Sequence, residues 1–169
     1  MGLLRGRDDD GGTRYQLREK IFSIGDDLWI GTEHDDRAFK VNGKALRLRR
    51  TLVIESKNGD ELFKIQTRAV SVRDTMKIER GGDTIATVKK ALVGIRARYH
   101  VDVDGGEDLR AQGNFVDHEF KIERDGKHVA EVSKRWFSIR DTYGIDVANG
   151  EDAAFAIAIV ICIDELTRG

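Results

Sequence analysis

The sequence contains no proline and only one cysteine, and each shortage excludes a class of protein. Without proline, collagen-like and polyproline segments are impossible. The single cysteine, Cys162, can form neither an internal disulfide nor a cysteine zinc cage. This thiol content favours a reducing, intracellular setting, so we expect a cytoplasmic protein.

An excess of charge of one sign is also missing. The 169 residues carry 29 Lys and Arg against 30 Asp and Glu, and only 7% of them are aromatic. A globally basic nucleic-acid binder is therefore excluded, and few side chains could stack on bases. Phosphate-binding glycine loops and nucleophile elbows are absent as well. We expect no cofactor, and we expect no catalytic residue.

The longest apolar run covers eleven residues, 153–163, and reads AAFAIAIVICI. As a helix it would span roughly 16 Å, whereas a bilayer core needs roughly 30 Å, so no transmembrane segment is expected. Acidic residues flank the run on both sides, and Glu151 and Asp152 suit a helix N-terminus. We predict a helix over residues 151–166, which must be buried on all sides because it is apolar all round.

Residues 15–147 show the pattern of half-buried strands. Apolar and polar residues alternate, as in the series of Tyr99, Val101 and Val103 and in that of Phe137, Ile139 and Tyr143. Turn signals such as Gly81-Gly82 separate the segments. We predict about twelve strands, preceded by a flexible leader at 1–13, in a single domain at 14–169.

The middle of the chain repeats itself. Residues 76–103 and 120–147 align without a gap at an offset of 44, and 13 of 28 positions are identical. Earlier, weaker copies align Ile30 with Ile54. Each copy contains a hairpin and the next strand, so the sheet consists of repeated units of this kind.

Many strands with one apolar face need a cover for that face. Closing the sheet removes its edges, and a twelve-stranded barrel is too wide for its own side chains to fill. The apolar C-terminal helix is the candidate plug. We therefore predict a mainly β protein, an antiparallel barrel that encloses this helix. A two-sheet sandwich whose helix is swapped or buried in a dimer is the alternative.

The segment SKRWFSIRDTYGIDVANGEDAAFAIAIVICIDEL at 133–166 resembles the LURP-one-related (YxjI-like) family of the tubby-like superfamily. The likeness extends from YQLREKIFSIGDDLWI at 15–30 to the C-terminus. It implies a twelve-stranded barrel around a central hydrophobic helix, in agreement with the strand pattern. Tubby domains bind phosphoinositide headgroups, but no tubby lipid-binding motif matches this chain residue by residue. Fold likeness alone does not transfer a function.

Outward-facing basic residues are the candidate lipid-headgroup site. Closure of the barrel could gather several of them on one side, where they would attract anionic headgroups. Acidic residues on the same faces favour a mixed, solvated surface as the alternative. The candidates are Arg47, Arg49, Lys89, Lys90, Arg96, Arg98, Lys134 and Arg135.

Equivalent strands also place Arg50, Asp74 and Asp141 in one inward slot. Buried carboxylates are costly unless paired, so we predict a structural polar cluster, with a paired-carboxylate enzyme site as the minor alternative. The histidines, His34, His100, His118 and His128, are scattered without ligand spacing, so surface positions and no metal site are expected. Cys162 lies inside the apolar helix and should be inert.

The sequence thus favours a non-enzymatic binding or scaffold module. Its partner would be an anionic membrane surface, which would make the protein peripheral, or an unidentified protein, and not nucleic acid. A carrier of a small apolar ligand inside the barrel is the second possibility. An enzyme that uses Asp74 and Asp141 is the third.

Overall fold

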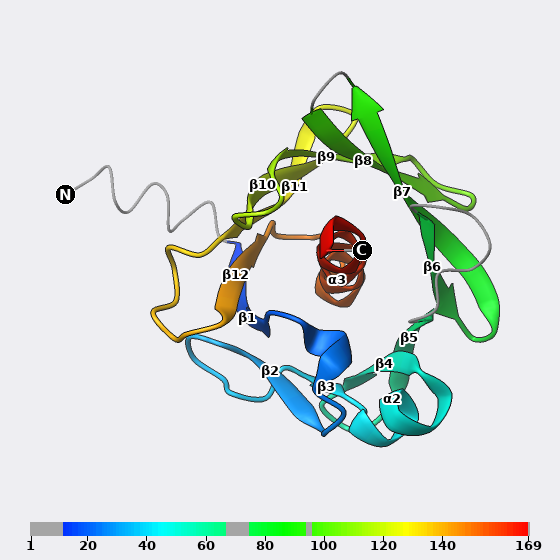
Figure 1. Cartoon of the computed structure of the whole chain (residues 1–169), viewed down its shortest axis with the longest axis vertical. Helices are drawn as coiled ribbons and strands as arrows, with labels where there is room; N and C mark the ends of the chain where they lie inside the picture. Colours follow the sequence, from blue (N-terminus) through cyan, green and yellow to red (C-terminus); the bar gives the residue numbers. More distant parts are fainter. Residues whose placement is uncertain (1–11, 67–74, 94–95, 169) are drawn as a thin grey trace.

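Residues 12–66, 75–93 and 96–168 are described by the computed structural model. Within them, twelve strands form a closed antiparallel barrel, in which strands adjacent in sequence pair and β1 closes the ring against β12 (Figure 1). The predicted closed, mainly β architecture is confirmed, and the two-sheet sandwich is wrong. The strands are β1 (Thr13–Arg18), β2 (Leu28–Thr32), β3 (Phe39–Val41), β4 (Thr51–Ser56), β5 (Glu61–Gln66), β6 (Thr75–Arg80), β7 (Asp83–Val93), β8 (Arg96–Val103), β9 (Leu109–Asn114), β10 (Glu119–Arg124), β11 (Lys127–Ser133) and β12 (Thr142–Val147).

Inward positions of the strands carry the barrel's apolar core. Ile54, Ile78 and Ile122 are completely buried, and a register shift follows each of them in its hairpin. These are β-bulges, which bend a strand and increase its twist. The bulges after Ile78 and Ile122 recur at positions that the internal repeat aligns, and each bulge adds local curvature to the ring.

The C-terminal helix α3 (Ala153–Arg168) begins two residues later than predicted. The carboxylate of Asp152 accepts a hydrogen bond from the backbone N–H of Phe155 at 3.1 Å, which caps the helix start. Every side chain from Ile157 to Ile163 is fully buried. The helix contacts β5, β6, β7 and β12, and it lies inside the ring of strands in Figure 1.

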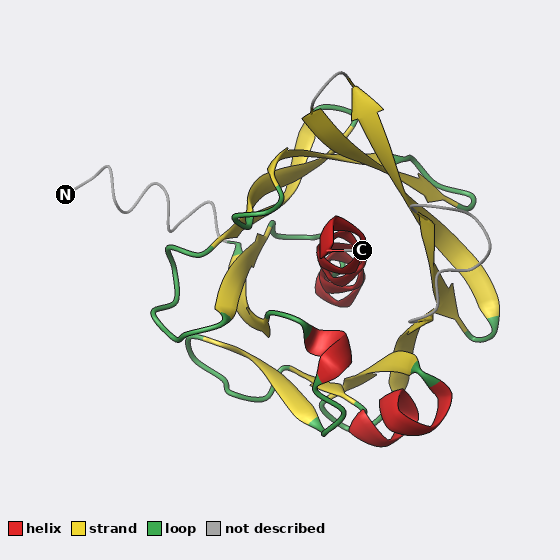
Figure 2. Cartoon of the chain, in the orientation of Figure 1, coloured by secondary structure: helices red, strands yellow, loops and turns green. Residues whose placement is uncertain are grey.

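Two short helical segments interrupt the strands, although only strands are predicted over residues 15–147. They are η1 (Ile21–Ser23) and α2 (Gly43–Arg49), drawn in red with α3 in Figure 2. The side chain of Asn42 accepts a hydrogen bond from the backbone N–H of Ala45 at 3.0 Å and thereby caps α2. Arg47 and Arg49 are therefore helical residues, not strand residues.

The strand predicted to contain Phe137 and Ile139 is wrong. Both residues lie in the loop between β11 and β12, and Ile139 is 57% exposed. The loop folds back on β12 at Gly144, where an added Cβ would lie 2.9 Å from the Phe137 ring and 3.0 Å from the Trp136 ring. The missing side chain at Gly144 thus makes room for two aromatic rings.

The domain boundary differs slightly from the predicted one. Thr13 already belongs to β1, where it pairs with Val147, whereas the predicted leader included it. The rest of that leader, residues 1–11, lies outside the described residues. In the part of the chain that is described, no helix has the length and apolar character needed to cross a membrane.

Truncation inside α3 should destabilise the protein strongly. We expect Ile159→Ala to lower the free energy of unfolding by about 2–5 kcal/mol, because it leaves a cavity at a fully buried site. Leu92→Ala is the matched control, since Leu92 is 72% exposed and should change stability by less than about 0.5 kcal/mol. Urea unfolding of both variants measures the difference, and equal effects would contradict the buried position of Ile159.

Candidate functional site

The antiparallel order of the strands separates the connecting loops into two sets, one at each end of the barrel. We call the end at which α3 terminates the α3 end. Its described loops are 19–27, 42–50, 115–118 and 134–141, and the ends of β7 and β8 join them. Direct contacts tie this end together, since Lys134 Nζ lies 2.7 Å from Glu19 Oε1, and the hydroxyls of Tyr99 and Thr167 are 2.8 Å apart.

A cavity of about 530 Å³ opens at the α3 end between β8, β9 and the last turn of α3. We call it the Lys90 pocket. The rings of Tyr99 and Phe115 line it and meet edge to face, with centroids 4.6 Å apart. Lys90, Arg96 and Arg98 bring three cations to the same cavity. Three of the eight predicted basic residues therefore come together.

The cations of the Lys90 pocket have no ion-pair partner among the residues that the structure describes. Among the described residues, no carboxylate forms an ion pair with Lys90, Arg96 or Arg98. The polar groups beside them are amides and hydroxyls, from Gln112, Asn114 and Thr167. A cavity with excess positive charge and neutral hydrogen-bonding groups suits an anionic ligand.

A second cavity, of about 590 Å³, lies beside α2 and the end of α3. Lys20, Arg47, Arg50 and Arg168 line it, together with Glu165. Arg47 is 3.9 Å from Asp26, and Arg168 is 3.2 Å from Glu165. Because carboxylates accompany two of these four cations, Arg47 and Arg168, the second cavity offers less free positive charge than the Lys90 pocket.

Three more of the predicted basic residues are bound to carboxylates. The amine of Lys89 contacts Asp102, and the guanidinium of Arg135 lies 3.9 Å from Glu119. Hydrogen bonding to Glu19 raises the pKa of Lys134. Arg49, at the end of α2, is exposed, and the described residues form no ion pair with it. The eight residues thus do not form one uniform patch.

The inward polar cluster is wrong for two of its three members. Arg50 and Asp141 are both exposed, and both have a positive φ, 50° and 58°. Each directly precedes a strand, β4 or β12, so these equivalent positions are turn residues and not core residues. Asp74 lies outside the described residues, so its pairing stays a prediction.

A different polar cluster, which the sequence did not reveal, is buried beneath the α3 end. Nε2 of His118 is 2.9 Å from Oδ1 of Asp164, and both side chains are less than a tenth exposed. Nδ1 of His118 lies 3.6 Å from Glu19, and Arg168 lies 3.2 Å from the second oxygen of Asp164. These contacts join α3 to the barrel wall through a buried polar pair.

His118 was expected at the surface, and this prediction is wrong. Its ring stacks on Tyr143 with centroids 4.3 Å apart. Burial, and secondarily the nearby Asp164, raises the pKa of Tyr143 well above its usual value, so its hydroxyl stays protonated. The partners of His118 are distant in sequence, which hides the cluster; Asp164 at the end of an apolar run was the only signal.

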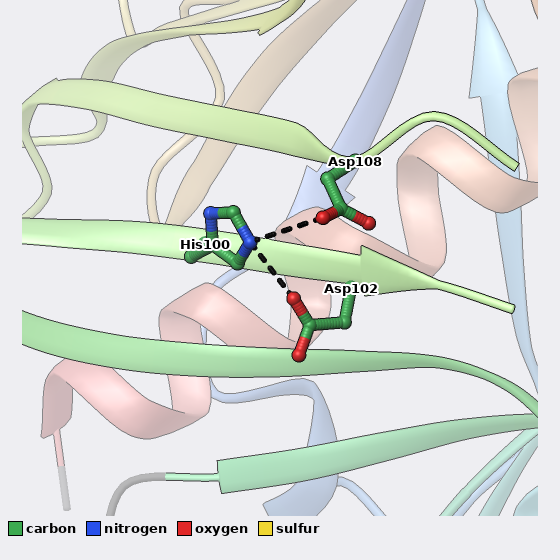
Figure 3. A group of neighbouring side chains, drawn as sticks. All are labelled: His100, Asp102 and Asp108. Atoms are coloured by element: carbon green, nitrogen blue, oxygen red, sulfur yellow. Dashed lines mark ion pairs between the residues drawn. The ribbon is translucent and has the colours of Figure 1, made fainter.

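His100 belongs to a group that sequence spacing also failed to reveal. Its Nε2 lies 2.8 Å from Asp102 and 3.4 Å from Asp108, as Figure 3 shows. Three ligand atoms of this kind could hold a divalent cation. However, Lys89 already binds Asp102, and this hydrogen bond lowers the pKa of Asp102. Lys89, His100, Asp102 and Asp108 form an ion network in this structure, while His34 and His128 are exposed as expected.

Cys162 fits its predicted inertness. The thiol is completely buried in α3, and this burial raises its pKa above the usual range. Since the thiolate is the reactive form, the residue cannot act as a nucleophile in the folded protein.

These features define a small β-barrel domain with a cation-lined cavity at one end. The profile of the LURP-one-related family matches residues 13–164, and the chain belongs to this family, as the resemblance indicated. A solved X-ray structure of a protein from Arabidopsis thaliana is similar, with 16% identity and a TM-score of 0.42, over 77% of this chain and 90% of that one. No curated protein matches the chain.

Loss of the buried histidine should cost stability. We expect His118→Ala to lower the free energy of unfolding by about 3 kcal/mol, because Oδ1 of the buried Asp164 would lose its partner and only the contact with Arg168 would remain. His128→Ala removes an exposed histidine at the opposite end and should change stability by less than about 0.5 kcal/mol. Thermal and urea unfolding at neutral pH would measure both, and similar stabilities would contradict the role given to the pair.

Proposed function

We propose that the protein is a non-enzymatic binding module that holds an anionic, phosphate-bearing headgroup in the Lys90 pocket. One observation carries the proposal: Lys90, Arg96 and Arg98 line a single cavity, and no described carboxylate neutralises them. Arg96 and Arg98 are exposed, so these cations are solvated and remain available to an anion. Bound phosphate would contact them through charge-assisted hydrogen bonds.

The shape of the pocket fits a headgroup better than a bare ion. Arg96 and Arg98 both lie on β8 and point to the same side of the strand, so two guanidinium groups can contact neighbouring phosphates. The rings of Tyr99 and Phe115 are almost completely buried and form the apolar wall behind the cations. An inositol carrying two or more phosphates combines these chemical features.

We further infer that α3 is a permanent plug in the barrel, as in the tubby-like architecture that the family resemblance implies. The complete burial of Ile157–Ile163 supports this arrangement. A plugged barrel leaves little interior space, which disfavours a carrier of apolar ligands. The exposure of Asp141 disfavours an enzyme built on inward carboxylates. Because the interior is filled, we place the ligand-binding site at the α3 end of the barrel.

Binding of inositol 1,4,5-trisphosphate tests this proposal directly. By calorimetry at low ionic strength, the wild type should bind it, and Arg96→Gln with Arg98→Gln should weaken binding by about tenfold or more per arginine. Lys57→Gln with Lys127→Gln is the matched control, since it removes the same charge at the opposite end. An equal loss in both double variants, or no binding by the wild type, would contradict the pocket.

A further inference from the structure

The large apolar side chains that remain exposed are not scattered over the surface. Four are exposed by more than half in the described residues: Leu48, Leu92, Val116 and Ile139. Leu48 lies on α2, Leu92 near the end of β7, Val116 in the β9–β10 turn and Ile139 in the β11–β12 loop. All four positions belong to the α3 end.

These positions surround the mouth of the barrel. In Figure 1, which views the barrel with α3 at its centre, α2 and the β11–β12 loop lie on different sides of α3, and β7 reaches a third side. Exposed apolar residues usually occur singly and need no explanation. Four of them on four separate segments around one opening form a ring of apolar tips, which suits a flat surface more than a groove.

The two ends of the barrel differ in charge, although the net charge of the whole chain is only −1. The described loops of the opposite end, together with residues 148–152, contain ten acidic and only two basic residues. The corresponding segments of the α3 end, with residues 164–168, contain nine basic and seven acidic residues. Lys90, Arg96 and Arg98 add three further cations there. The protein therefore has a positive end and a strongly negative end.

We propose that the protein docks end-on to an anionic bilayer, with the α3 end facing the membrane and Leu48, Leu92, Val116 and Ile139 entering the headgroup region. This inference deepens the proposed function and rests on it for the identity of the lipid. The charge division orients the approach, because the acidic end is repelled by the same surface that attracts the basic end. The apolar tips then add contacts that salt does not screen.

The geometry also explains the position of the Lys90 pocket. Val116 lines that cavity, and Leu92 lies two residues from Lys90. Insertion of these side chains would bring the cavity to the depth of lipid headgroups. The bilayer contact and the headgroup contact are therefore made by one surface in one orientation.

Site-specific labelling tests the orientation. Leu92→Cys and His128→Cys each receive an environment-sensitive dye, and Cys162 does not compete because it is buried. With phosphatidylcholine vesicles that contain roughly one-fifth phosphatidylserine, the dye at position 92 should shift to shorter wavelength, whereas the dye at position 128 should not. Vesicles of phosphatidylcholine alone should produce a much smaller shift. An equal response at both positions, or none at position 92, would overturn the docking orientation.

A pair of serine substitutions tests the apolar contribution. Leu48→Ser with Leu92→Ser should lower vesicle binding by about tenfold. It should leave the affinity for soluble inositol trisphosphate unchanged, because neither residue lines the Lys90 pocket. Asn58→Ser with His128→Ser is the control at the opposite end. Unchanged vesicle binding by the leucine variant would overturn the insertion of these tips.

The two proposals fail in different ways. If soluble inositol trisphosphate binds but the dye at position 92 does not respond to vesicles, the docking inference fails and the pocket stands. If the dye responds but the soluble headgroup does not bind, the proposal of a headgroup site in the Lys90 pocket is rejected. The proposal that the α3 end docks to an anionic surface is then retained.

Discussion

Burial of the apolar side chains of α3 is the interaction on which the rest of the structure depends. A closed ring of twelve strands cannot fill its own interior, and the inward isoleucines of the strands need apolar partners. Helix α3 supplies a surface that is apolar all round, with Ile157–Ile163 completely buried. Each component would expose a large apolar surface without the other, so ring and helix must fold together.

The position of α3 also determines where ligands can bind. If α3 fills the interior, as proposed above, the surfaces left for binding are the outside of the barrel and its two ends. At the α3 end, the last helical turn contributes Thr167 to one cavity and Arg168 to the other. The buried pair of His118 and Asp164 fixes the height of this turn against the wall. The element that stabilises the barrel thus also shapes the floor of both cavities.

Much of the architecture could be predicted because it follows from periodic patterns. Alternation of apolar residues revealed the strands, and the continuous apolar run revealed α3 and its burial. Irregular segments could not be predicted in this way. Helix α2 depends on one cap, Asn42, and the β11–β12 loop imitates strand alternation although its rings pack outside on Gly144.

The candidate site was predictable only in part, since it depends on which distant residues meet. The sequence identified the cations, but it could not distinguish Lys90, Arg96 and Arg98 from Lys134 and Arg135, which are paired with glutamates. The partners of His118 come from the loop that follows β1 and from α3, far away along the chain. Strand register and loop packing determine which side chains form such ion pairs and hydrogen bonds. Neither produces a recognisable local pattern in the sequence.

The central claim, that ring and helix form one cooperative unit, is tested most directly by thiol exchange at Cys162. This side chain is fully buried in the middle of α3, so a thiol reagent can reach it only when the helix leaves the barrel. Labelling rates across a range of urea concentrations give the free energy of that opening. The account predicts a value equal to the global free energy of unfolding. A markedly smaller value, with weak dependence on urea, would show that α3 detaches while the barrel persists.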